Sequence, residues 1–113
     1  MNAKKLALKN SAAVFAALGD PTRLAMVALL CGAGPLPTIR LKQAIRSSRQ
    51  AVTKHLNLLE TTGILTSKRV GRDRLWRIEP HRLNETRAYI DQISADWDAA
   101  LERLRKFVEK NSG

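Results

Sequence analysis

An apolar stripe in the last third of the chain constrains the fold more than any other feature. From Ile90 onward, apolar side chains recur at steps of three or four residues, as they do on one face of a helix. The stripe consists of Ile90, Ile93, Trp97, Leu101, Leu104 and Val108. It predicts a long helix from about residue 82 to about residue 110. A chain of 113 residues has little core with which to cover such a stripe, but a second copy of the chain could cover it.

The rest of the chain is divided into short segments by residues that start and stop helices. Apolar spacing predicts four shorter helices, over residues 10–18, 22–31, 39–45 and 49–62. Asp20, Thr38 and Ser48 precede three of these helices, and their residue types cap helix N-termini. Two basic strands follow, over residues 64–70 and 74–78, and the turn between them contains Gly71. This arrangement is typical of a β-hairpin.

The fourth predicted helix presents two different faces. One face is apolar and points to the core, whereas the other groups polar side chains at helical spacing. Side chains of this kind can contact base edges when a helix lies in the major groove of DNA. We expect such contacts first from Gln50, Thr53 and Lys54, and next from Arg49 and Asn57. An ordinary solvated face is the alternative.

Positive charge gathers in the middle third of the chain. The sequence has 20 Lys and Arg against 10 Asp and Glu, and residues 40–77 hold ten of the bases but two of the acids. This pattern predicts a phosphate-binding face, although solubility alone would also explain it. We expect phosphate contacts from Ser48 and His55, and backbone or minor-groove contacts from Arg72 and Arg74 in the hairpin. For His55, a packing role on the helix is the alternative.

Together these elements predict a winged helix-turn-helix, a fold that is mainly α with a small β-hairpin. We expect one DNA-binding domain over residues 1–113 that carries a long C-terminal dimerisation helix, with double-stranded DNA as its partner. The alternative is an architectural or protein-interaction module that binds DNA without reading its sequence. An RNA-binding winged helix is less suited, because two Trp, one Tyr and two Phe leave little with which to stack bases.

Four segments of the chain resemble the ArsR-type transcriptional regulators. Residues 17–24 (ALGDPTRL) are similar to the start of that family, residues 48–56 (SRQAVTKHL) to its recognition helix, residues 58–65 (LLETTGIL) to the exit of that helix, and residues 70–76 (VGRDRLW) to its wing. The resemblance covers about residues 12–109. It implies a homodimer that pairs through its first and last helices, binds inverted-repeat operators and represses transcription. The interface that it implies adds Val14 and Phe15 to the apolar stripe.

The sequence lacks the ligands with which many relatives in that family bind metals. Residues 36–45 contain no Cys, His, Asp or Glu, and the last helix has no histidine after His81. Because soft and borderline metals need thiolate or imidazole ligands, we expect no metal site and no cofactor. Phe15, Tyr89 and Trp97 could border an apolar pocket for a small-molecule effector at the dimer interface, but nothing else in the sequence supports an effector. The favoured alternative is that these three side chains are simply the core of that interface. We expect Cys31 to be a buried, inert thiol, and a single-cysteine redox sensor that bridges two subunits is the alternative.

Several classes of protein do not fit the sequence. No apolar run approaches the roughly 18–20 residues of a membrane span, and Asp20-Pro21 suits a helix start better than a signal-peptide cleavage site. One cysteine cannot form an internal disulfide. No Ser/His/Asp or Cys/His arrangement and no glycine-rich phosphate loop favours an enzyme. We therefore expect a non-enzymatic cytoplasmic protein with no membrane partner.

Overall fold

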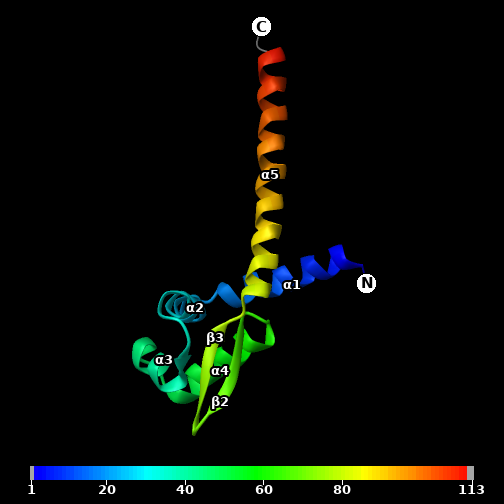
Figure 1. The fold of residues 1–113 in the computed structure, drawn as a ribbon. Helices are drawn as coiled ribbons and strands as arrows, with labels where there is room; N and C mark the ends of the chain where they lie inside the picture. The colour runs from blue at the N-terminus through cyan, green and yellow to red at the C-terminus, as the bar shows by residue number, and fades with distance from the viewer. Residues whose placement is uncertain (1, 112–113) are drawn as a thin grey trace.

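The computed structural model describes residues 2–111, and Figure 1 shows a long helix rising from a small body. The helices are α1 (Ala3–Leu18), α2 (Pro21–Ala33), α3 (Thr38–Ile45), α4 (Arg49–Thr61) and α5 (Pro80–Asn111). The strands are β1 (Leu36–Pro37), β2 (Leu65–Val70) and β3 (Asp73–Ile78). The fold is thus mainly helical with a small antiparallel sheet, as predicted. Residues 1, 112 and 113 of the predicted domain lie outside the described residues.

The first and last helices are longer than the sequence predicted. α1 begins at Ala3 rather than at residue 10, because the Asn2 side chain accepts a hydrogen bond from the Lys5 N–H at 2.8 Å and caps the helix. α5 spans Pro80–Asn111, beyond the predicted range of about 82–110 at both ends. A proline suits the first turn of a helix, where its missing N–H has no helical partner to lose.

Two of the three predicted N-caps are confirmed. The Asp20 carboxylate accepts a hydrogen bond from the Arg23 N–H at 3.0 Å at the start of α2. The Ser48 hydroxyl accepts one from the Ala51 N–H at 3.1 Å at the start of α4. Each bond satisfies an N–H group that the first turn of a helix leaves without a partner.

The prediction that the Thr38 side chain caps α3 is wrong. Its Oγ1 instead accepts a hydrogen bond of 2.9 Å from Nε1 of Trp76, whose side chain is 1% exposed. The N–H of Ile39 donates to Oδ2 of Asp73 at 3.2 Å, so the first residue of β3 caps α3. Because Asp73 and Ile39 are 34 residues apart in the chain, no local sequence pattern could indicate this cap.

The hairpin is part of a three-stranded sheet. Val70 pairs with Asp73, which leaves a two-residue turn in which Gly71 adopts a φ of 62°, a conformation that glycine enters without strain. β1 adds a strand that the sequence analysis missed, and it pairs with Leu75 and Trp76 of β3 in the order β1-β3-β2. A two-residue strand that contains a proline shows no alternation of apolar and polar residues.

The core lies where the inner faces of α1–α4 meet the sheet. Its side chains are at most 7% exposed and comprise Val14, Ala17, Met26, Val27, Leu30, Leu41, Val52, Leu56, Leu59, Ile64, Leu65 and Trp76. The predicted place of Val14 in a dimer interface is wrong, because its side chain is fully buried in the chain's own core. The expected burial of Cys31 is also wrong, because this thiol is exposed.

Most of α5 projects away from the body. α1 lies across its first turns (Figure 1), where Ser11 and Thr86 are buried and Asn10 donates a hydrogen bond to Glu85 at 3.3 Å. The described molecule is 71 Å along its longest axis. The six residues of the predicted stripe, from Ile90 to Val108, are between 44% and 64% exposed. The chain alone therefore leaves the stripe uncovered.

Replacing Thr38 with Val should destabilise the fold through Trp76. The substitution leaves the indole N–H without a partner in the core, and a buried unpaired donor costs about 1–3 kcal/mol. We expect the free energy of unfolding, measured by urea titration, to fall by about that amount. Thr61→Val is the matched control, because the Thr61 hydroxyl is exposed on α4 and donates to the Asn57 carbonyl. Equal losses in the two variants would contradict the role of this bond.

Candidate nucleic-acid interface

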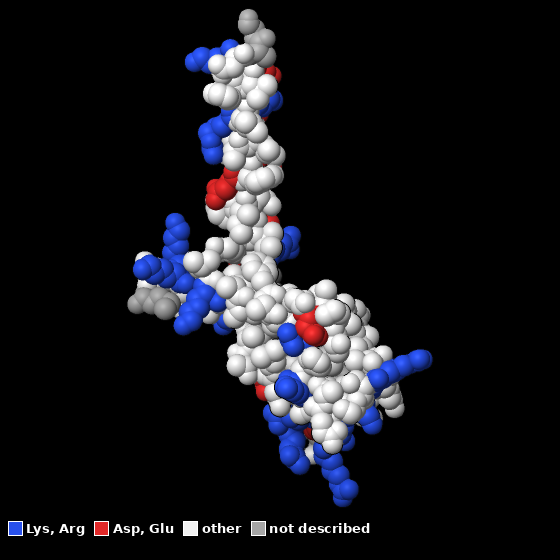
Figure 2. Space-filling view, turned by 180° about the vertical axis from the view of Figure 1, so that it is seen from behind, with Lys and Arg blue, Asp and Glu red and all other residues white. Residues whose placement is uncertain are grey.

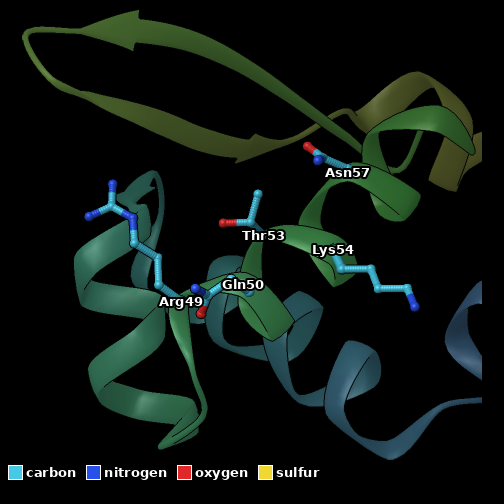
Figure 3. Close-up of a pocket in the computed structure, with 5 residues that line it drawn as sticks. All are labelled: Arg49, Gln50, Thr53, Lys54 and Asn57. Atoms are coloured by element: carbon cyan, nitrogen blue, oxygen red, sulfur yellow. The ribbon is translucent and has the colours of Figure 1, made fainter.

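One face of α4 brings together the five side chains that the sequence predicted for base contacts. Figure 3 shows Arg49, Gln50, Thr53, Lys54 and Asn57 around one open hollow of about 560 Å³. Thr53 is half-buried and the other four residues are exposed. The opposite face of α4 is packed into the core. The helix is thus anchored by its apolar side, and its polar face is open to a ligand.

The hairpin of β2 and β3 lies beside this face (Figure 3). It carries the two predicted wing arginines, Arg72 in its turn and Arg74 on β3. Arg74 donates from Nε to the Ser67 hydroxyl at 3.0 Å, and that hydroxyl donates to Oε2 of Glu60 on α4 at 2.5 Å. These bonds hold Arg74 against the hairpin and tie the hairpin to α4. Arg72 is exposed in the turn and has no hydrogen bond or ion pair within residues 2–111. The Arg72 side chain is therefore the less constrained of the two.

Positive charge is concentrated at this end of the molecule. In Figure 2, Lys and Arg gather around the end that holds the hairpin, α3 and α4, and few acidic residues are visible there. A second basic group lies at the beginning of α1, where the chain has Lys4, Lys5 and Lys9. α5 carries both signs of charge. The basic residues that the sequence concentrates in its middle third thus lie together at one end of the structure.

Asp73 is an acidic group inside this basic end. Desolvation raises the pKa of its carboxyl, but hydrogen bonds from Thr38 and from the N–H groups of Arg74 (2.7 Å) and Ile39, together with the nearby charge of Arg49, outweigh desolvation. The pKa of Asp73 therefore lies below its ordinary value of 3.8. The carboxylate stays charged near neutral pH and holds the hairpin against the N-terminus of α3.

His55 lies outside the hollow that the five predicted base contacts line. Its half-buried ring faces α2, where Nδ1 lies 3.4 Å from Nη1 of Arg23. Because a guanidinium can only donate, Nδ1 accepts and the ring proton of neutral His55 lies on Nε2. Arg23 is itself held in place, since its Nε donates to the Ala17 carbonyl at 2.7 Å. The sequence analysis missed Arg23 at this site because it is 32 residues from His55 in the chain.

Two further features concern metals and membranes. Within residues 2–111, no three His, Cys, Asp or Glu side chains lie close enough together to hold a metal ion. No single helix in that part of the chain is long and apolar enough to cross a membrane, and α1 and α2 meet the criteria of length and composition only as a pair bent by 101°.

The sequence and the fold are similar to those of known transcriptional regulators, although no family model matches the chain. The arsenical resistance operon repressor of Escherichia coli is 30% identical over 95 residues, which cover 84% of this chain and 79% of the repressor. The solved structure of an ArsR-like transcriptional regulator from Rhodococcus sp. RHA1 is 35% identical, has a TM-score of 0.77, and matches over 88% of this chain and 93% of that one. The chain belongs to the ArsR family.

A further solved structure shares the fold at lower identity. The homodimeric winged helix-turn-helix DNA-binding domain of a possible ArsR-family regulator from Mycobacterium bovis is 23% identical, with a TM-score of 0.65 over 85% of this chain and 87% of that one. These comparisons confirm the predicted family and the predicted winged helix-turn-helix. As an ArsR protein, the chain is a transcriptional regulator.

Replacing Asp73 with Asn should remove a part of the stability that depends on pH. Because the pKa of Asp73 is lowered on folding, its carboxylate stabilises the fold above the unfolded value of 3.8, and this stabilisation is lost as the pH falls through the folded pKa. Urea titrations from about pH 6 to about pH 2.5 measure the free energy of unfolding. Near pH 6 this free energy should be larger for the wild type than for the variant, and the difference should shrink below about pH 4.

The control for this experiment is Asp98→Asn, which neutralises an exposed carboxylate on α5 far from the hairpin. A gap between wild type and Asp73→Asn that stays constant over the whole pH range would show that the charge of Asp73 does not stabilise the junction.

Proposed function

We propose that this ArsR protein is a homodimeric repressor that binds inverted-repeat operators in double-stranded DNA. The observation that supports this function most strongly is the polar face of α4, on which five side chains suited to base edges lie together beside a basic hairpin. An α-helix fits the major groove, where each base pair presents a distinct pattern of donors and acceptors. The chain would act as one winged DNA-binding domain carrying a dimerisation helix, and as a DNA-bound repressor it would work in the cytoplasm.

The five side chains on α4 differ in what they can recognise. Gln50 and Asn57 have amide groups that can pair with adenine in a bidentate manner, whereas Arg49 and Lys54 suit guanine. Thr53 can contact either a polar base edge or the thymine methyl group. We propose Gln50, Thr53 and Lys54 as the principal base contacts, with Arg49 and Asn57 next to them.

The proposed phosphate contacts surround this face. Ser48 accepts the capping hydrogen bond of α4, which leaves its O–H free to donate to a phosphate at the helix N-terminus. Arg72 can extend from the hairpin turn to the backbone or the minor groove, whereas Arg74 has a shorter reach because it is bound to Ser67. His55 can donate to a phosphate through Nε2, since its Nδ1 faces Arg23.

Exposed apolar side chains support the dimer. The stripe on α5 includes Trp97 at 64% exposed, and Phe15 on α1 is 39% exposed. Contiguous apolar surface of this kind marks an interface with another protein. The Mycobacterium bovis relative of the same fold is homodimeric. We therefore propose that α1 and α5 pair with those of a second copy.

Selection of genomic DNA fragments on the purified protein, at roughly physiological salt, tests the function directly. We expect an enriched inverted repeat whose half-sites lie about one helical turn, or a multiple of it, apart. Enrichment by fragment length alone, lost steeply as salt rises, would instead indicate an architectural protein that binds phosphates without reading bases.

Gln50→Ala and Thr53→Ala should each relax the sequence preference. Loss of one base contact costs about 1–3 kcal/mol of discrimination at one position of each half-site. Competition binding with a set of single-substitution operators measures this effect, and Gln92→Ala on the exposed part of α5 is the matched control. Equal weakening on every sequence would remove both residues from the list of base contacts.

Arg72→Ala should weaken binding to all duplexes to a similar degree. If Arg72 contacts a phosphate, the slope of log affinity against log salt concentration should become shallower by about one unit. Fluorescence anisotropy at several salt concentrations measures this slope. Lys106→Ala removes the same charge from the far end of α5 and should leave the slope unchanged. An unaltered slope in Arg72→Ala would show that its side chain does not neutralise a phosphate.

Trp97→Asp should convert the dimer into a monomer. A carboxylate cannot be buried without a partner in an apolar interface at acceptable cost. Sedimentation velocity at micromolar concentration measures the oligomeric state, and Ala95→Asp places the same group on α5 two residues away, outside the stripe. A dimer that survives Trp97→Asp would place the interface elsewhere.

A further inference from the structure

A second hollow lies on the side of α4 that faces α2. It measures about 510 Å³, and Arg23, Lys54, His55 and Asn57 are among the residues that border it. Lys54 and Asn57 also border the hollow proposed for base contacts, so the two hollows adjoin along α4. Figure 3 shows the Lys54 side chain extending away from the hairpin. A DNA strand leaving the base-contact face on this side would therefore pass over Arg23.

Arg23 is fixed in position, yet part of its guanidinium has no partner. Its Nε donates to the Ala17 carbonyl at 2.7 Å, and its Nη1 lies 3.4 Å from Nδ1 of His55. A guanidinium has five N–H donors, and the other three have no hydrogen bond within residues 2–111. Two neighbouring donors on the Nη1–Nη2 edge match two oxygens of one phosphate group. The side chain is thus held in advance for a bidentate contact.

The groups around Arg23 favour an anion in this hollow. Lys54 contributes a charge, and neutral His55 has its remaining proton on Nε2 for donation. The nearby carboxylate is that of Asp20, which already accepts the Arg23 backbone N–H at 3.0 Å as the cap of α2. That hydrogen bond, with the charge of Arg23, keeps the pKa of Asp20 below its ordinary value. The Asp20 carboxylate is thus already engaged in capping α2. Its one negative charge stands against two positive charges, on Arg23 and Lys54.

The width of the major groove explains why a site is needed on this side. A helix with its side chains is about 10–12 Å across, and the groove is about 12 Å wide. A helix that enters the groove therefore lies close to a phosphate strand on each flank. The hairpin with Arg72 serves one flank of α4, and the side facing α2 is left for the other strand.

We propose that Arg23, His55 and Lys54 form a second phosphate site that binds the DNA backbone on the α2 side of α4. Arg23 makes the bidentate contact, His55 braces its guanidinium and donates from Nε2, and Lys54 adds charge at the border with the base-contact face. This site rests on the DNA binding proposed above, and its ligand is one phosphodiester of the bound duplex.

The test compares Arg23→Gln, which removes the charge, with Arg23→Lys, which keeps the charge but not the fork. The probe is a random 30-base-pair duplex, so the outcome does not depend on a known operator. For Arg23→Gln we expect the slope of log affinity against log salt to become shallower by about one unit and the affinity to fall about tenfold. For Arg23→Lys we expect weaker binding with a slope close to that of the wild type. Arg87→Gln on α5 is the matched control, and both its affinity and its salt slope should equal those of the wild type.

A second measurement separates a phosphate contact from a structural effect. Single phosphates of the selected operator are replaced by neutral methylphosphonates. The replacement at one position on the α2 flank should lower the affinity of the wild type about tenfold. It should lower the affinity of Arg23→Gln much less, because the variant no longer has the interaction to lose. Equal weakening of both proteins at every position, or an unchanged salt slope in folded Arg23→Gln, overturns the proposal.

The outcomes also separate this site from the wider function. A wild type that binds no duplex would overturn both proposals. Binding of every sequence alike, with the slope altered in Arg23→Gln, would refute the repressor and keep the phosphate site. A third outcome would show a site for free phosphate rather than for the DNA backbone. In that case inorganic phosphate at about 50 mM shifts the His55 ring resonances of the wild type, but methylphosphonates in the operator leave its affinity unchanged. This outcome also overturns the proposal.

Discussion

The hydrogen bond between the Trp76 indole and the Thr38 hydroxyl joins the two halves of the proposed DNA-binding surface. Trp76 belongs to the hairpin and Thr38 begins α3, so the bond fixes the sheet against the helix that precedes α4. Asp73 strengthens the same junction, because its carboxylate caps α3 through the Ile39 N–H. The spacing between the polar face of α4 and the hairpin turn therefore depends on this junction, together with the Ser67–Glu60 hydrogen bond that ties the hairpin directly to α4. Without these bonds, the side chains proposed for bases and for backbone would not share one orientation.

The sequence predicted what local patterns determine and missed what distant residues determine. The helices, the hairpin and the caps Asp20 and Ser48 were predictable, because capping and periodicity act within a few residues. The cap by Asp73 and the contact of Arg23 with His55 were not, because each joins residues more than 30 positions apart. Val14 was misplaced for another reason, since apolar spacing on α1 does not tell whether the chain's own core or a partner covers that side.

The contrast between the body and α5 shows why a partner is proposed. The body has a continuous core, whereas α5 beyond its first turns has local contacts such as those of Arg105 with Glu102 and Glu109, all of them exposed. Exposed ion pairs of this kind contribute little stability. In the proposed dimer, apolar contacts that one chain does not make would chiefly stabilise this long helix, so that folding of α5 and association of two copies would occur together.

The shortness of the hairpin turn has a consequence for which operators can be bound. Two residues connect β2 to β3, and Trp76 fixes β3 to the core, so the wing has no slack chain with which to extend. Arg72 can adjust by rotating its own side chain, but the wing cannot move outward to meet a distant backbone. The duplex must therefore bring its backbone to the protein. Operators that are easily bent or narrowed beside the half-site would be favoured at base pairs that no side chain touches, so the stiffness of the DNA becomes part of the recognition.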